Sequence, residues 1–246
     1  MLNFSPSDNL SSAVKKVQIA YMQDNRKPII ASVTVNTGQT PKPPEGAEGA
    51  PEGAEAPPAA MPRPKIYRFM WKATDPNGDP MKYVVYLRRV DSPYWLELQK
   101  DVSSPMMMWD PRSAPDGRYE LKVIASDELA NPAGMGLTET RISDPFIVDN
   151  TPPVVQNLSC KLIEKDKLLI QAQLSDEMSE IDGAWISINA GKDWQYIAPA
   201  DEIYDTKNEK IDGAVPLKED SVKPLMITIK VTDTAGNTGY SWKLVQ

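Results

Sequence analysis

Two stretches of the chain alternate apolar and polar side chains in the same way. Residues 119–127 read Tyr-Glu-Leu-Lys-Val-Ile-Ala-Ser-Asp, and residues 225–233 read Leu-Met-Ile-Thr-Ile-Lys-Val-Thr-Asp. A period of two places successive side chains on opposite faces of an extended chain, so both stretches are predicted to be half-buried β-strands. Each ends in a hydroxyl residue and an aspartate before a loop. We predict that each is the central strand of a β-sandwich, and that the chain is all-β with two sandwiches in tandem.

The same alternation predicts the other strands of the first sandwich. In residues 66–75, Tyr67, Phe69 and Trp71 share one face. Residues 28–35 begin with a proline, which lacks a backbone N–H and suits an edge strand. In that strand, even-numbered positions are expected on one face and odd-numbered positions on the other. The remaining strands are predicted at 81–89, 94–98 and 106–110, and residues 136–148 close the domain.

Residues 149–153, Asp-Asn-Thr-Pro-Pro, are predicted to form the boundary between the two sandwiches. The two prolines remove backbone donors and stiffen the chain. The domains are therefore predicted at 28–149 and 154–246, with 150–153 as the linker. Strands of the second domain are predicted at 154–163, 167–175, 184–190, 193–197, 213–217, 224–233 and 239–245.

Two other segments do not follow the alternation. Residues 38–64 are rich in proline, alanine, glycine and glutamate and contain no aromatic residue, Ile, Leu or Val. Such a segment cannot bury enough apolar surface to offset its ordering entropy, so it is predicted to be a flexible low-complexity insert unless a partner holds it. Residues 1–27 fit either a capped helix or a strand, and are predicted to be an N-terminal extension or the tail of a missing upstream domain.

Composition and charge exclude several classes of protein. The chain has no histidine, which removes the commonest general base, Ser-His and Cys-His nucleophile pairs and His-ligated metal sites. A net charge of −7 argues against nucleic acid and anionic membrane surfaces as partners. No apolar run is long enough to cross a membrane. The single cysteine, Cys160, cannot form an intrachain disulfide and is predicted to be a small buried apolar residue.

Acidic loop residues suggest a calcium hypothesis. Asp75, Asn77 and Asp79 have the spacing of oxygen ligands in calcium loops, although proline and tyrosine stand where an EF-hand needs glycine and glutamate. Because the B–C and F–G loops of a sandwich lie at one end, these three residues and Asp127 can converge on one ion. The alternative is that the same side chains cap turns. A second acidic set near the linker carries the same two alternatives: Asp176, Glu177, Asp182 and Asp233, beside Asp149.

Two apolar features suggest binding surfaces. Four tryptophans either form a sugar-stacking face or belong to the cores: Trp95, Trp109, Trp194 and Trp242. The run Met106-Met107-Met108 places apolar side chains on both faces of a strand, so one of these faces is predicted to be covered by another domain or copy.

Several motifs resemble known modules. Trp71-Lys-Ala-Thr-Asp-Pro-Asn-Gly-Asp79, Trp95-Leu-Glu-Leu98 and Pro115-Asp-Gly-Arg-Tyr119 resemble a fibronectin type III module, especially the tyrosine-rich modules that follow β-propellers in bacterial extracellular and sensor proteins. The resemblance covers 28–149 and implies an immunoglobulin-like sandwich in which Tyr119 forms a tyrosine corner. In the second half, the segment Val231-Thr-Asp-Thr-Ala-Gly-Asn-Thr238 resembles bacterial Ig-like repeats. Such modules imply non-catalytic spacers or interaction surfaces.

These observations lead to a functional prediction. We predict a non-enzymatic structural or interaction module of a bacterial extracytoplasmic protein (extracellular, cell-surface or periplasmic), which spaces or assembles neighbouring domains or subunits, including by self-assembly. The alternative is a glycan- or ligand-binding accessory module of an enzyme or sensor. A two-carboxylate hydrolase is a third class, and neither half has room for a cleft beyond its sandwich. Calcium at the residues named above is the cofactor considered, and neither nucleic acid binding nor membrane insertion is expected.

Overall fold

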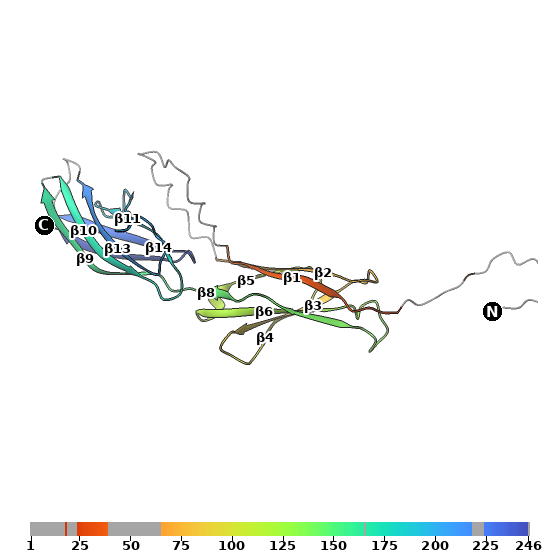
Figure 1. Cartoon of the computed structure of the whole chain (residues 1–246). Coiled ribbons are helices and arrows are strands. Elements are labelled where there is room, and N and C mark those ends of the chain that lie inside the picture. The colour runs from red at the N-terminus through yellow and green to blue at the C-terminus, as the bar shows by residue number, and fades with distance from the viewer. Residues whose placement is uncertain (1–17, 19–23, 39–64, 165, 218–223, 246) are drawn as a thin grey trace, which may run out of the picture.

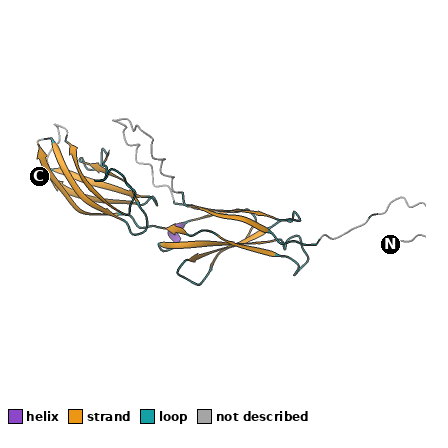
Figure 2. Ribbon diagram, viewed as in Figure 1, coloured by secondary structure: helices purple, strands orange, loops and turns teal. Residues whose placement is uncertain are grey.

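The structure is a computed structural model, and it describes residues 18, 24–38, 65–164, 166–217 and 224–245. The insert predicted at 38–64 and most of the extension predicted at 1–27 lie outside these residues. Apart from one 3-10 turn, Pro111–Ser113, every regular element of the described residues is a β-strand. Figures 1 and 2 show two strand-rich bodies arranged end to end.

The first body consists of two sheets that face each other. One sheet has the order β1-β2-β5, and the other has the order β4-β3-β6-β7, with β8 also paired to β6. All of these pairs are antiparallel. The strands are β1 (Ile29–Asn36), β2 (Tyr67–Thr74), β3 (Lys82–Arg89), β4 (Leu96–Val102), β5 (Met106–Trp109), β6 (Gly117–Ser126), β7 (Thr138–Ile142) and β8 (Phe146–Val148).

The second body repeats this order of strands. Its sheets have the orders β9-β10-β13 and β12-β11-β14-β15, so the first, second and fifth strands again face the fourth, third, sixth and seventh. The strands are β9 (Val154–Glu164), β10 (Lys167–Ser175), β11 (Ile181–Ser187), β12 (Gln195–Tyr196), β13 (Asn208–Pro216), β14 (Leu225–Asp233) and β15 (Thr238–Val245). This strand order lets positions in the two bodies be compared directly.

The two stretches with period-two alternation are inner strands, as predicted. β6 lies between β3 and β7, and β14 lies between β11 and β15. Their apolar side chains alternate into two separate cores, one for each body. The all-β, immunoglobulin-like sandwich prediction is therefore confirmed. The buried apolar side chains of these strands are Tyr119, Leu121, Val123 and Ala125 in β6, and Leu225, Ile227, Ile229 and Val231 in β14.

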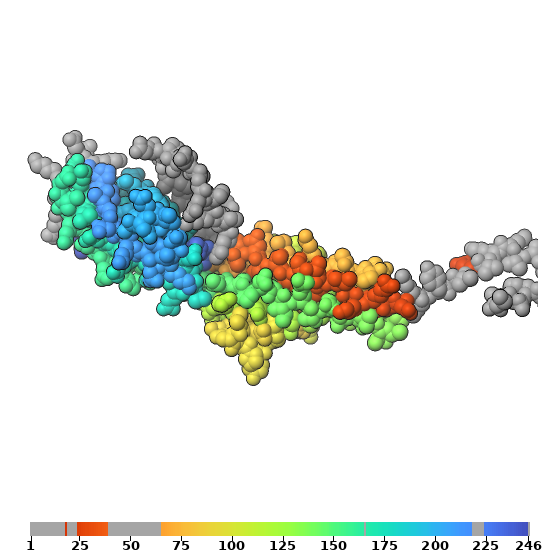
Figure 3. All heavy atoms as spheres, in the orientation of Figure 1, coloured from red at the N-terminus to blue at the C-terminus, as the bar shows by residue number. Residues whose placement is uncertain are grey.

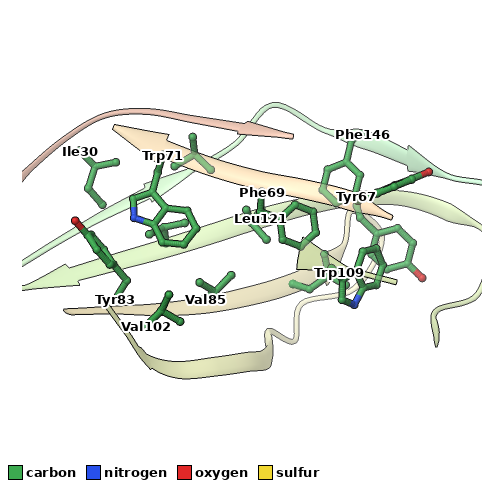
Figure 4. Close-up of a cluster of buried hydrophobic side chains, with 14 of the residues drawn as sticks. Ile30, Tyr67, Phe69, Trp71, Tyr83, Val85, Val102, Trp109, Leu121 and Phe146 are labelled. Atoms are coloured by element: carbon green, nitrogen blue, oxygen red, sulfur yellow. The ribbon is translucent and has the colours of Figure 1, made fainter. Parts of the chain in front are cut away.

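Aromatic rings fill one end of the first core (Figure 4). The rings of Phe69 and Trp109 stack with centroids 5.6 Å apart, and Tyr67 meets Phe146 edge-on at 6.1 Å. Such pairs add about 0.5–1.5 kcal/mol each to the burial of apolar surface. At the same end, the hydroxyl of Tyr119 donates to the carbonyl of Pro115 at 2.7 Å. This is the tyrosine corner that the sequence resemblance implied.

A β-bulge changes the alternation in β1. The pairing with β2 shifts between Ile30 and Ser32, and a bulge adds one residue that the partner strand does not match. Ile30 and Val33 are both buried although one is even-numbered and the other odd-numbered. The strict alternation predicted for residues 28–35 is therefore wrong, because the bulge moves the second half of the strand to the opposite phase.

Some strand limits also differ from the prediction. β4 starts at Leu96 and continues to Val102, and β13 starts at Asn208, well before the predicted 213. The apolar alternation does not extend to the start of β13, because the inward position there is occupied by a glutamate. This residue, Glu209, is 5% exposed. Its carboxylate accepts the backbone N–H groups of Thr206 at 2.8 Å and Asp205 at 3.2 Å. These hydrogen bonds satisfy a buried charge that the alternation rule treats as a surface position.

Candidate functional site

The segment between β8 and β9 is hydrogen bonded to both sandwiches. Asp149 is buried with 0% of its surface exposed. Its carboxylate accepts the hydroxyl of Ser179, from the second sandwich, and the N–H of Thr151 at 3.1 Å. Its carbonyl accepts the ammonium of Lys65, from the first sandwich, and the amide of Asn237, from the second, at 3.3 Å. One residue thus joins groups from both bodies.

The next two residues are bonded back to the first sandwich. The N–H of Asn150 donates to Asp116 at 2.7 Å, and the amide of its side chain donates to the carbonyl of Ala114 at 3.1 Å. The hydroxyl of Thr151 donates to the other carboxylate oxygen of Asp116. Each such bond contributes about 0.5–1.5 kcal/mol. The segment is therefore bonded on both sides, and we call residues 149–153 with these partners the junction.

A glycine makes room for the end of the junction. Gly239, near the start of β15, lies against the backbone of Pro153, and a Cβ at this position would overlap the carbonyl oxygen of Pro153. The obstacle is backbone on both sides, so no side chain can move away to relieve the overlap.

Three carboxylates meet at the junction. Oxygens of Asp149, Asp176 and Asp233 lie within 4.8 Å of one another. The structure thus brings together two members of the predicted second acidic set, with Asp149, but not Glu177 or Asp182. Burial, together with the nearby Asp149 and Asp176, raises the pKa of the Asp233 carboxyl to about 6, against the hydrogen bonds from Asn237. Burial also raises the pKa of Asp149.

Lys65 brings a positive charge to these carboxylates. Burial lowers the pKa of its ammonium group, while the charges of Asp149, Asp233, Asp116 and Asp176 act in the opposite direction. Its amino group comes from the residue just ahead of β2 in the first sandwich. The sequence analysis missed Lys65, because nothing local marks a lysine that reaches a segment 84 positions away.

The first acidic set forms a similar group at the opposite end of the first sandwich. Oxygens of Asp75, Asp79 and Asp127 lie within 4.8 Å of one another. The side chain of Asn77 bonds to the segment ahead of β1 instead: it accepts the N–H of Arg26 at 2.9 Å and donates to the carbonyl of Asp24 at 3.0 Å. Three of the four predicted calcium ligands therefore converge, and their oxygens are of the kind that bind divalent cations.

Turn capping, the alternative to calcium, accounts for part of this geometry. One oxygen of Asp75 accepts the N–H groups of Asn77 at 2.7 Å and of Asp79 at 3.2 Å. Both oxygens of Asp127 are also bonded, to the N–H of Leu137 at 2.6 Å and to the amide of Asn25 at 3.0 Å. The second oxygen of Asp75 is buried and has no hydrogen-bond partner among the described residues. Calcium binding at this group stays a prediction.

The outer face of the sheet β12-β11-β14-β15 carries a group of aromatic rings. We call it the aromatic face, and its members are Trp185, Trp194, Tyr196, Tyr240 and Trp242. Tyr240 is 62% exposed and Trp242 is 61% exposed. The rings of Trp194 and Tyr240 lie 6.3 Å apart, and the ammonium of Lys230 lies 4.5 Å from the ring centre of Trp185. The rings are tilted rather than coplanar, with 58° between Trp194 and Tyr240.

The four tryptophans of the sugar-stacking hypothesis separate into three places. Trp109 belongs to the first core, and Trp95 lies under Arg88 and Lys122 on the first sandwich. Trp194 and Trp242 both lie on the aromatic face. Trp185, which the hypothesis did not include, joins them because its position in β11 is opposite Lys230.

A methionine run, a cavity and the single cysteine lie elsewhere in the two sandwiches. Met107 packs on the first core, whereas Met106 and Met108 are exposed beside Met70 on the outer face of β2 and β5. A cavity of about 750 Å³ opens near Trp194 and Met226 in the second sandwich. Cys160 is buried, as predicted, and burial raises the pKa of its thiol.

Replacing Gly239 by alanine is expected to destabilise the second sandwich. The added methyl group must displace the backbone of Pro153, at a cost of about 2 kcal/mol. The measurement is the urea dependence of unfolding. Gly213→Ala is the matched control, because this glycine is also in a strand of the second sandwich and a Cβ there would have its nearest neighbour at 4.0 Å. Equal effects of the two substitutions would contradict the close approach of Pro153.

Replacing Asp233 by asparagine is expected to weaken the pH dependence of stability. Since its pKa is raised to about 6 in the folded state, the folded protein keeps a proton that the unfolded chain has lost between about pH 4 and pH 6. The free energy of unfolding of the unmodified protein therefore falls as the pH rises through this window. At about 1.4 kcal/mol per pKa unit, the fall from this group is about 3 kcal/mol.

The measurement is urea denaturation at about pH 4 and about pH 7.5. Asp212→Asn is the control, because it removes an exposed carboxylate from the same sandwich. Asp212→Asn is expected to show the full fall in the free energy of unfolding between the two pH values. Asp233→Asn is expected to show a smaller fall. Identical falls would mean that Asp233 does not titrate in this window.

The comparisons with known proteins find similarity among solved structures, but not among family models or curated proteins. Within the described part of the chain, no helix is both long and apolar enough to span a bilayer. No protein-family model matches the chain, and no curated protein matches it. Among solved structures, the crystal structure of the FN1–FN3 domains of chicken CNTN1 is similar, at 16% identity and a TM-score of 0.32. The match covers 74% of this chain and 62% of that one, so the chain spans less than two thirds of that fragment. The fold assignment rests on the strand order given above.

Proposed function

We propose that this chain is a non-catalytic structural and interaction module that holds two immunoglobulin-like sandwiches end to end in one orientation. The observation that carries the proposal is the junction. Asp149 is buried and bonded to Ser179, while its neighbour Asn150 is bonded to Asp116 on the other side. A linker that served as a simple tether would not need hydrogen bonds to both domains.

The chemistry of the chain supports a non-catalytic role. There is no histidine to act as a base, and the cysteine thiol is buried. The carboxylate groups lie at turns, where they accept backbone N–H groups. We further propose that the module belongs to a bacterial extracytoplasmic protein, in which it spaces or assembles neighbouring domains or subunits. This part of the proposal rests on the sequence resemblance to fibronectin type III and Ig-like modules.

The orientation of the two sandwiches is expected to be fixed, which spin-label distances can test. The labels replace Glu97 on the first sandwich and Lys161 on the second, both exposed, in a background with Cys160→Ala. A single narrow distance distribution is expected. Asp149→Ala removes the carboxylate that Ser179 and Thr151 bond to and is expected to broaden it, whereas Asp144→Ala, at an exposed position two residues before β8, leaves it unchanged.

A broad distribution in the unmodified protein would overturn the structural role. The same measurement with calcium and with a chelator tests the calcium hypothesis. If calcium occupies the junction carboxylates, the chelator is expected to broaden the distribution of the unmodified protein more than that of Asp149→Ala, because this variant lacks one ligand.

The aromatic face supports a second candidate function, the binding of glycans. Tyr240, Trp242 and Tyr196 are all more than half exposed on one sheet, at 62%, 61% and 53%. Exposed aromatic rings provide apolar surface with little side-chain entropy to lose on binding.

If this candidate function holds, Trp242→Ala is expected to abolish retardation of the protein in gels that contain a bound polysaccharide. Affinity electrophoresis over a panel of neutral and acidic polysaccharides is the measurement. Tyr94→Ala is the control, since Tyr94 is 81% exposed on the first sandwich. Retardation that is equal in both variants, or absent for every polysaccharide, would remove the glycan function and leave the structural one.

A further inference from the structure

The segments that enter the two sandwiches begin with the same pair of residues. Asp24-Asn25 precedes β1, which begins at Ile29, and Asp149-Asn150 precedes β9, which begins at Val154. The two pairs therefore stand at the same distance from the strands that follow them. Because the two sandwiches share one strand order, these pairs occupy equivalent places in the fold.

The aspartates that follow the second and sixth strands also occupy equivalent places in the two sandwiches. Asp75 directly follows β2, and Asp176 directly follows β10, which are the second strands of the two sandwiches. Asp127 directly follows β6, and Asp233 ends β14, which are the two central strands. In each sandwich these aspartates belong to a group of three carboxylates. The N-terminal end of the first sandwich thus repeats two of the carboxylates on which the second sandwich receives the first; the third member of the group is Asp79 in the first sandwich and Asp149 in the second.

In the second sandwich this surface is covered. Asp149 is 0% exposed, and the preceding sandwich supplies the ammonium of Lys65 to its carbonyl. We call this arrangement, an entering Asp-Asn pair with the aspartates after the second and sixth strands, the seat. The preceding sandwich covers the seat through the residues at the start of β2 and in the turn before β6, where Lys65 and Asp116 lie.

In the first sandwich the same seat has acceptors without donors. Oδ2 of Asp75 and Oδ1 of Asn25 are buried and have no hydrogen-bond partner among the described residues. Oδ1 of Asn150 lacks a partner at the covered seat too, so the difference between the two seats lies at Asp75. A buried acceptor without a donor costs about 1–3 kcal/mol, so the seat gains stability from any group that supplies one. Asp24, the equivalent of Asp149, is exposed.

Apolar side chains surround this uncovered seat. Leu129 is 62% exposed and Met135 is 55% exposed, and both lie in the connection between β6 and β7. The carbonyl of Met135 accepts the amide of Asn25 at 3.2 Å, so this connection lies beside the entering segment. An apolar rim around buried acceptors is the surface that a second domain end would cover.

We propose that the N-terminal end of the first sandwich is a docking seat for the C-terminal end of another sandwich of this kind, one that carries a lysine at the place of Lys65. The lysine brings to the carboxylates of Asp75 and Asp127 the positive charge that Lys65 brings to the carboxylates of the internal junction, and the rim of Leu129 and Met135 is buried against the incoming domain. This inference rests on the proposed function, because it takes the internal junction as the example of a covered seat.

The test adds a sandwich to the full chain. Residues 24–148 are duplicated so that Val148 of the added copy is followed by Asp24 of the chain, as Val148 is followed by Asp149 at the internal junction. Spin labels replace Glu97 in the added copy and Asn36 in the sandwich that follows it, because Asn36 stands as far from the start of β1 as Lys161 does from the start of β9. The pair at the internal junction is measured in a parallel sample.

A distance distribution as narrow at the new junction as at the internal one is expected. Lys65→Met in the added copy alone is expected to broaden the new distribution, whereas Lys100→Met, at an exposed lysine in β4 of the added copy, leaves it unchanged. A broad distribution at the new junction beside a narrow internal one overturns the seat and leaves the proposed function intact. Broad distributions at both overturn the proposed function as well.

A second measurement, on the chain without an added sandwich, guards against misfolding of the duplicated copy. Calcium is titrated while the amide resonances of Asn25, Asp75 and Met135 are followed. Docking of a domain end is the alternative to calcium at Asp75, Asp79 and Asp127, so no shift beyond that caused by magnesium at equal ionic strength is expected. Saturable shifts with calcium alone would show that the unmatched acceptors take a metal ion, which overturns the docking proposal.

Discussion

A polar group that leaves water must find hydrogen bonds, and at the junction the carboxylate and the carbonyl of one residue together find them on both sandwiches. Asp149 leaves water where the chain passes from one to the other, and its partners come from both. If the second sandwich turned away from the first, the carbonyl of Asp149 would lose Lys65, and Asn150 would lose Asp116. The end-to-end arrangement visible in Figures 1 and 3 follows from satisfying these groups.

Much of the fold could be predicted from the sequence because a sandwich with one buried face imposes a period of two on its strands. This works best where the strand is regular, as in β6 and β14. It fails in β1, where a bulge changes the phase between Ile30 and Ser32, and at the start of β13, where Glu209 is buried and bonded by local N–H groups. In both places the period-two rule fails, because it takes no account of the bulge in β1 or of the N–H groups that bond to Glu209.

The candidate site was predictable only in part, for a related reason. Asp75, Asp79 and Asp127 could be grouped because the loops of a sandwich meet at its ends, and the spacing of short polar residues marks turns. Asn77 has the right spacing, but its side chain bonds to the entering segment instead. Lys65 and Asp116 act over long separations in sequence, and a single chain carries no local sign of such pairs. The repeated Asp-Asn pair ahead of each first strand was the sign available.

The junction also shows why polar groups hold the two domains rather than an apolar contact. Three carboxylates within 4.8 Å repel one another, and burial, with a further contribution from Asp149 and Asp176, raises the pKa of Asp233. An apolar interface of the same size would avoid the cost, but it would be satisfied by many relative orientations, because apolar contacts are not directional. Hydrogen bonds to buried acceptors have few acceptable geometries. The proposed role of the module is to set the orientation of its neighbours. For such a role, one defined geometry matters more than the stability that is lost to repulsion between the carboxylates.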